Sequence, residues 1–155
     1  MSYPPLDLTN KTAVVIGGTS GIGLALAKAL AQAGADVVPT GRRAAHVAAA
    51  AAEIQALGRR SLAQVCDVTD RASIAALLKA VCSEFEGVQI LVNRAGRTKR
   101  LPTIDFPDTD WDAIIETNLT GTLRACQVFG KHMIEQSYGR IITSLPWRHS
   151  WRYSK

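Results

Sequence analysis

Short apolar runs alternate with amphipathic stretches along most of the chain. The runs are rich in β-branched residues and predict strands at 12–16, 36–40, 61–66 and 88–93. The stretches between them are rich in alanine and leucine and predict helices at 22–33, 43–57 and 71–85. Strands and helices that alternate at this spacing indicate βαβ units, in which helices cover both faces of a parallel sheet.

The pattern after residue 107 predicts one long helix from 108 to about 136, followed by a fifth strand near 141–143. Apolar residues recur on one face of this helix at intervals of three and four: Trp111, Ile114, Ile115, Leu119, Leu123, Cys126, Phe129 and Met133. The fold class predicted is α/β, a doubly wound Rossmann-type parallel sheet of about five strands.

The length and the termini limit the class of protein. A chain of 155 residues fits one domain with a sizeable core. The first eleven residues include Pro4 and Pro5 and lack an apolar signal core, and no run is long enough to cross a bilayer. We therefore expect a cytoplasmic protein with no membrane partner.

Charge and cysteine usage exclude further classes. The net charge is +5, but no aromatic stacking platform or known binding motif accompanies the basic residues, so no nucleic-acid partner is expected. The cysteines Cys66, Cys82 and Cys126 are scattered and form no C-x-x-C pair. This spacing favours neither a disulfide framework nor a metal site.

A glycine-rich turn between the first strand and the first helix carries the strongest chemical signal. Gly17, Gly21 and Gly23 are spaced G-x-x-x-G-x-G. Glycines allow close approach of the backbone to a diphosphate, and the free amides of the following helix favour negative charge. A tight βα connection that only packs on the sheet is the alternative, because close helix–strand packing also requires glycine.

Four motifs in this order give the chain a resemblance to the short-chain dehydrogenase/reductase family over residues 8–143. They are V-I-G-G-T-S-G-I-G at 15–23, C-D-V at 66–68, N-R-A-G at 93–96 and D-W-D-x-x-x-x-x-N-L at 110–119. In style the chain is similar to the sugar-acid 5-dehydrogenases and 3-oxoacyl carrier-protein reductases of that family. The resemblance implies hydride transfer between a nicotinamide and a small-molecule carbonyl or alcohol substrate.

The resemblance also implies the residues that bind the cofactor. The diphosphate would lie over the turn formed by Gly17, Thr19, Ser20, Gly21, Ile22 and Gly23. After the second strand the chain has Arg42 and Arg43 and no carboxylate. A guanidinium suits the 2′-phosphate of NADP, whereas an acidic residue suits the ribose hydroxyl of NAD, so we expect NADP rather than NAD. A solvated helix start is the alternative for the two arginines.

The remaining motifs supply the adenine side and the nicotinamide side of the same site. Asp67 and Val68 resemble the residues that contact the adenine, and a cap on the next helix is the alternative for Asp67. Asn93, Ala95 and Gly96 resemble the family motif that steadies the central strand and lines the cofactor. Arg94 and Ile16 depart from that family, which usually has a small or amide residue and a threonine there. We interpret Arg94 as an irregularity and not as a catalytic group.

Asn118 is the one residue of this chain to which the resemblance gives a catalytic part. In the family this asparagine bends the long helix, and its backbone carbonyl holds a water of a proton relay. A surface asparagine without a role is the alternative.

The family's catalytic serine, tyrosine and lysine are not reproduced. Ser144 lies near the expected serine, but Pro146 occupies the aligned position. Tyr153 and Lys155 are two residues apart instead of four, so on a helix they would point away from each other. No catalytic role is therefore transferred to them.

We predict two parts, an NADP-binding domain at 1–143 and an atypical basic tail at 144–155. The chain is expected to be a truncated, catalytically silent cofactor-binding portion of an oxidoreductase that forms homo-oligomers when complete. A non-catalytic nucleotide-binding or dimerising module is the alternative.

Overall fold

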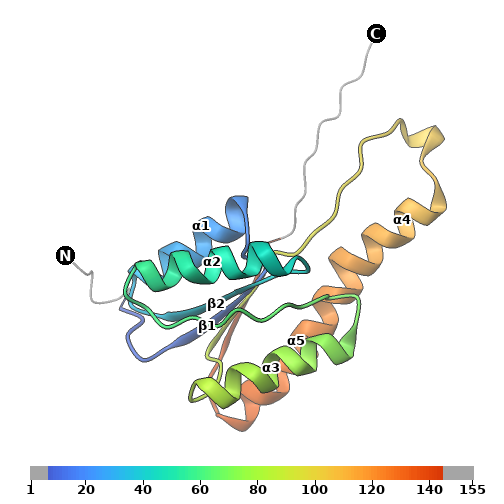
Figure 1. Cartoon of the computed structure of the whole chain (residues 1–155). Coiled ribbons are helices and arrows are strands. Elements are labelled where there is room, and N and C mark those ends of the chain that lie inside the picture. The colour runs from blue at the N-terminus through green and yellow to red at the C-terminus, as the bar shows by residue number, and fades with distance from the viewer. Residues whose placement is uncertain (1–6, 145–155) are drawn as a thin grey trace.

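The computed structural model describes residues 7–144, which build a sheet of four parallel strands (Figure 1). The strands are β1 (Thr12–Ile16), β2 (Asp36–Thr40), β3 (Ile90–Asn93) and β4 (Arg140–Thr143). Their order in the sheet is β2-β1-β3-β4, and every neighbouring pair is parallel. The chain adds β2 on one side of β1 and then β3 and β4 on the other side. The strand order therefore reverses between β1 and β3, and such a switch point leaves a crevice at the carboxyl ends of the strands.

Helices cover both faces of the sheet, as predicted. In Figure 1, α1 (Gly21–Gln32) and α2 (Ala44–Ala56) lie above it, whereas α3 (Arg71–Glu84) and α5 (Gly121–Glu135) lie below. The alternation along β1 explains the two layers. Val14 and Ile16 pack with α3 and α5, and Ala13 and Val15 pack with α1. Burying each valine or isoleucine stabilises the fold by about 1.5–3 kcal/mol.

The strand predicted at 61–66 is not formed, and this corrects the expected five strands to four in the part of the chain that the structure describes. The segment still follows β2, and Val37 N donates to Arg60 O at 3.1 Å. The N–H groups of successive strand residues point to opposite neighbours, so residue 39 is the next residue of β2 whose N–H would point toward this segment. That residue is Pro39, which has no N–H, and the ladder is interrupted there.

The long helix runs over the predicted length but widens in the middle. It consists of α4 (Asp108–Ile115), the π-helical turn η3 (Glu116–Thr120) and α5. The predicted buried face is confirmed at Phe129 and Met133 of α5, where Ala125, which was not predicted, is buried as well. Trp111 and Leu119 are more than half exposed because α4 and η3 extend past the sheet (Figure 1). Leu123, in the first turn of α5, is also more than half exposed, so the prediction is wrong there too.

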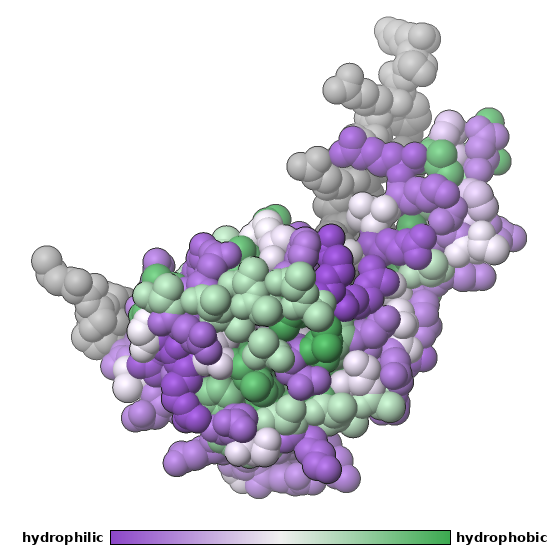
Figure 2. Space-filling model, viewed as in Figure 1, coloured by the Kyte–Doolittle hydropathy of each residue, from purple (hydrophilic) through white to green (hydrophobic). Residues whose placement is uncertain are grey.

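Two surfaces distinguish the outside of the molecule. The projecting arm formed by α4 and the loop before it, which contains the short helix η2 (Thr103–Asp105), is largely hydrophilic, whereas the alanines of α2 form a pale apolar band (Figure 2). On β4, Ile141 and Ile142 are exposed. Within residues 7–144, no helix combines the length and the apolarity needed to span a membrane.

Candidate functional site

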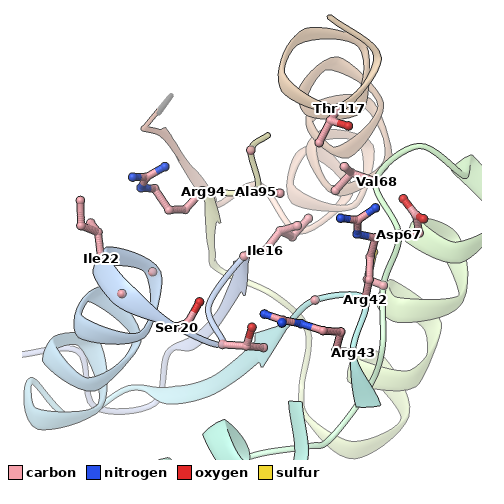
Figure 3. Close-up of a pocket in the computed structure, with 17 residues that line it drawn as sticks. Ile16, Ser20, Ile22, Arg42, Arg43, Asp67, Val68, Arg94, Ala95 and Thr117 are labelled. Atoms are coloured by element: carbon pink, nitrogen blue, oxygen red, sulfur yellow. The ribbon is translucent and has the colours of Figure 1, made fainter. Parts of the chain in front are cut away.

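A cavity of about 790 Å³ opens at the carboxyl ends of β1 and β3, at the switch point of the sheet (Figure 3). It brings together twelve of the thirteen residues predicted to bind a cofactor: Gly17, Thr19, Ser20, Gly21, Ile22, Gly23, Arg42, Arg43, Asp67, Val68, Ala95 and Gly96. Its volume lies in the range of small-molecule and cofactor sites, about 300–1,000 Å³.

The glycine-rich turn is packed so closely that side chains are excluded from two of its positions. Gly17 has a φ of +83°, and a Cβ there would lie 2.5 Å from Ala95 N. A Cβ on Gly23 would lie 1.9 Å from Gly17 O. The amides of Gly17 and Gly18 both donate to Thr40 O, at 2.8 and 3.1 Å, which ties the turn to the end of β2. At Gly17 and Gly23, glycine is therefore required by close packing of the βα connection, which was the alternative interpretation of the turn.

Gly21 behaves differently, because it faces the cavity. Its φ is +52°, and a Cβ there would meet no atom of the described chain within 4 Å. The first helical hydrogen bond of α1 joins Leu24 N to Ser20 O at 3.2 Å. The amides of Gly21, Ile22 and Gly23 precede that bond and are the orphan donors that a helix start leaves. Free amides and the positive end of the helix dipole fit an anion such as a diphosphate.

Arg42 and Arg43 extend into the cavity from the end of β2 (Figure 3). Arg43 is also the N-cap residue of α2, and its side chain makes no capping hydrogen bond. Cations are disfavoured at a helix start, so this position is not explained by helix stability. The pair forms a cationic end of the cavity.

Asp67 contributes a carboxylate to the same wall. Its Oδ1 accepts hydrogen bonds from Thr69 N at 2.9 Å and Thr69 Oγ1 at 2.8 Å. Burial works to raise the pKa of Asp67, but these two bonds and the charge of Arg42 outweigh it, so the pKa lies below its ordinary value. Asp67 therefore stays ionised, and its second oxygen remains available to accept from a ligand.

The neighbours of Asp67 complete this wall. Val68 is buried, and a Cβ on Gly121 would lie 2.8 Å from its Cγ2, so the start of α5 holds it in place. Burial raises the pKa of Cys66 to about 11, which keeps the thiol neutral. Cys66 is therefore an unreactive part of the wall.

Asn93 is the predicted cofactor residue that does not line the cavity. It is buried under the end of β3, where its Nδ2 lies 3.4 Å from both Thr143 Oγ1 and Cys126 Sγ. These contacts join β3 to β4 and α5, so the structure places Asn93 as a support of the sheet.

Asn118 also lies outside the cavity lining, within the π-helical turn η3. Its Oδ1 accepts from Arg97 N at 2.8 Å, and its Nδ2 donates to Arg97 O at 3.0 Å. Its backbone carbonyl accepts from Thr122 Oγ1 at 2.8 Å. The side chain thus fastens the long helix to the loop after β3, and a part in proton transfer stays a prediction.

Five residues that line the cavity were not predicted as site residues from the sequence: Ile16, Gly41, Cys66, Arg94 and Thr117. Gly41, Cys66 and Thr117 each directly precede a predicted site residue. Their position next to those residues in the sequence is the feature that could have predicted them. Arg94 was interpreted as an irregularity, yet it faces the cavity. Pro146, Tyr153 and Lys155 lie outside the described residues.

Comparison with known proteins agrees with this geometry. Residues 11–144 match the family model described as short chain dehydrogenase. The chain is 36% identical over 143 residues to gluconate 5-dehydrogenase of Gluconobacter oxydans, covering 92% of this chain and 56% of that protein. It is 39% identical over 137 residues to a 3-oxoacyl-[acyl-carrier-protein] reductase of Vibrio cholerae, covering 88% of this chain and 55% of that protein.

A solved structure matches a similar share of the chain. A short-chain type dehydrogenase/reductase from Mycobacterium marinum superimposes with a TM-score of 0.86 at 33% identity, covering 89% of this chain and 56% of that one. The chain thus spans about half the length of the curated relatives it matches.

Proposed function

Because this chain belongs to the short chain dehydrogenase family, we propose that it binds NADP in the cavity at the end of its sheet. The diphosphate lies over the amides of Gly21 and Ile22, and the adenine side lies against Asp67 and Val68. The observation that carries the proposal is the junction of three features around one cavity: an open glycine-rich turn, a helix start with free amides, and a pair of arginines.

The preference for NADP over NAD rests on the charge at the end of β2. Arg42 and Arg43 line the cavity there, and neither neighbouring residue is acidic. A guanidinium binds a 2′-phosphate through charge-assisted hydrogen bonds, whereas a carboxylate at this place would repel it. The Asp67 carboxylate is ionised, but its Oδ1 accepts a hydrogen bond from Thr69 N and its charge is offset by Arg42.

The reaction proposed for the protein is hydride transfer between the nicotinamide and a carbonyl or alcohol group. NADP supplies the hydride chemistry when bound. The residues of this chain bind and orient the cofactor, and Asn118 fixes the loop that borders the cavity. The relatives named as a gluconate 5-dehydrogenase and a 3-oxoacyl reductase act on such groups, which supports this class of small-molecule substrate and leaves its identity open.

A non-catalytic nucleotide-binding or dimerising module is the second candidate for the 155 residues themselves. The observation that favours it is the absence of any Tyr-x-x-x-Lys segment from the printed sequence. A phenol has a pKa near 10, so it serves poorly as a base at neutral pH without a cation one helical turn away. We expect the 155-residue chain to bind NADPH without turning over a carbonyl substrate.

Fluorescence titration with NADPH and NADH tests the proposal. We expect tighter binding of NADPH, and we expect Arg42→Asp to weaken it by about tenfold to a hundredfold while NADH binding changes little. Arg100→Gln is the matched control, since Arg100 is exposed and does not line the cavity. Equal affinities for the two coenzymes would overturn the NADP preference. Steady oxidation of NADPH with a carbonyl substrate would show that the chain is not silent.

A further inference from the structure

Arg94 is a partly buried cation that has no ion-pair partner among residues 7–144. Its Nε is buried and makes no hydrogen bond in the described structure. The ion pairs found within residues 7–144 do not include it. Every Asp and Glu of the sequence lies in that part of the chain, so no acidic side chain balances Arg94.

The backbone of Arg94 is fixed against the glycine-rich turn. Its amide donates to Ile16 O at 2.8 Å, which continues the pairing of β3 with β1. A Cβ on Gly17 would lie 2.7 Å from the carbonyl carbon of Arg94. The start of the arginine side chain is therefore held at the point where the turn leads into α1.

The guanidinium lies at the end of the cavity opposite Arg42. In Figure 3 the side chain of Arg94 extends toward Ile22, at the start of α1, whereas Arg42 extends toward Asp67. The cavity thus has two separate cationic ends. The free amides of Gly21 and Ile22 lie at the end that Arg94 serves.

An unpaired guanidinium in a partly buried place is costly, and an anion that binds there removes the cost. The positive end of α1 acts on the same space and favours the same sign of ligand. A group with two negative phosphates bridges main-chain amides on one side and a guanidinium on the other. The 2′-phosphate is assigned by the proposed function to Arg42 and Arg43, at the end of β2, which leaves the diphosphate for the end near Ile22.

We propose that Arg94 is a cofactor-binding residue whose guanidinium donates hydrogen bonds to the diphosphate of the dinucleotide. This inference rests on the proposed function, since it assigns a contact within the same site. The two arginines would then have different roles. Arg42 distinguishes NADP from NAD, whereas Arg94 binds the diphosphate, which the two coenzymes share.

Titrations of the full 155-residue chain with NADPH and with NADH test the assignment in Arg94→Gln. We expect both dissociation constants to rise by about tenfold, the loss typical of a hydrogen bond to a charged group. Adenosine 2′-monophosphate, which has no diphosphate, is the third probe and should bind the variant and the wild type equally. Arg100→Gln is the control for removal of one positive charge from a site outside the cavity.

The outcomes separate the two proposals. Wild-type binding of NADPH with unchanged affinities in Arg94→Gln would overturn the role of Arg94 and leave the proposed function intact. Absence of coenzyme binding to the folded wild type would overturn both. Arg94→Lys guards against a folding effect, because it keeps the charge. If its affinity for NADH is restored to within about threefold of wild type, the charge is what binds. A loss as large as in the glutamine variant, with a lowered melting temperature in both variants, would assign Arg94 to structure instead.

Discussion

Gly23→Ala tests whether the turn must be as tightly closed as the structure shows. The added Cβ would lie 1.9 Å from Gly17 O and 2.8 Å from Gly17 C, and both are backbone atoms that cannot rotate away. Overpacking of a closed site costs about 1–3 kcal/mol. Alanine recovers about 1 kcal/mol through its better helix propensity. The 1.9 Å approach to a backbone oxygen places the cost at the upper end of the range, so the net loss expected is about 2 kcal/mol. For a chain of this size, the melting temperature should fall by roughly 5 °C.

Gly130→Ala is the matched control, because Gly130 lies within α5 and its Cβ would make only an ordinary contact, 3.8 Å from Ile141 Cδ1. The same substitution should raise the melting temperature there by about 2–4 °C. Circular dichroism melts measure both variants. Gly23→Ala should also weaken NADPH binding, since the turn has to open to admit the methyl group. A Gly23→Ala protein that melts at or above the wild-type temperature would refute the reasoning.

Three further predictions concern single side chains. Asn118→Ala should speed hydrogen exchange of the Arg97 amide, which loses its acceptor, whereas Asn118→Asp keeps the acceptor and should leave the exchange slow. Because the pKa of Asp67 is lowered in the folded state, its contribution to stability is present above the unfolded pKa and is lost as the pH falls. The stability advantage of wild type over Asp67→Asn should therefore shrink as the pH falls below about 4 in denaturant titrations, and an advantage that grows with acid would contradict this. Burial and a pKa of about 11 should make Cys66 the slowest of the three cysteines to react with iodoacetamide at pH 8, which peptide mass mapping would show.

The sequence predicted the sheet, the helices and most of the cavity because each depends on local pattern. The β-branched runs that formed β1 and β2, and Gly17 and Gly21 with their positive φ, act through their own backbone preferences. The strand expected at 61–66 failed for a non-local reason: the missing donor is Pro39, on the neighbouring strand. The pattern within residues 61–66 carries no information about which residues of the adjacent strand can donate hydrogen bonds.

Side-chain direction was the other quantity that the sequence did not reveal. Asn93 and Arg94 are adjacent, yet the first supports the sheet and the second lines the cavity, because successive residues of a strand point to opposite faces. Asn118 belongs to a motif of the site, yet its side chain binds the Arg97 backbone instead of lining the cavity. Motif membership therefore located the region, and the fold decided which atoms face a ligand.

The interrupted pairing beside β2 makes the cavity unequal in rigidity. On one side, β1 and β3 form a continuous ladder that holds the glycine turn. On the other side, the backbone that carries Cys66 and Asp67 depends on isolated bonds, such as those of Val37 with Arg60 and of Cys66 with Gly41. Few shared bonds lower the free energy of local opening of this backbone, so we expect its amides to exchange faster than those of the β1–β3 ladder. An adenine bound as proposed would therefore meet the less rigid side of the cavity, and part of its binding energy would be spent on ordering that side.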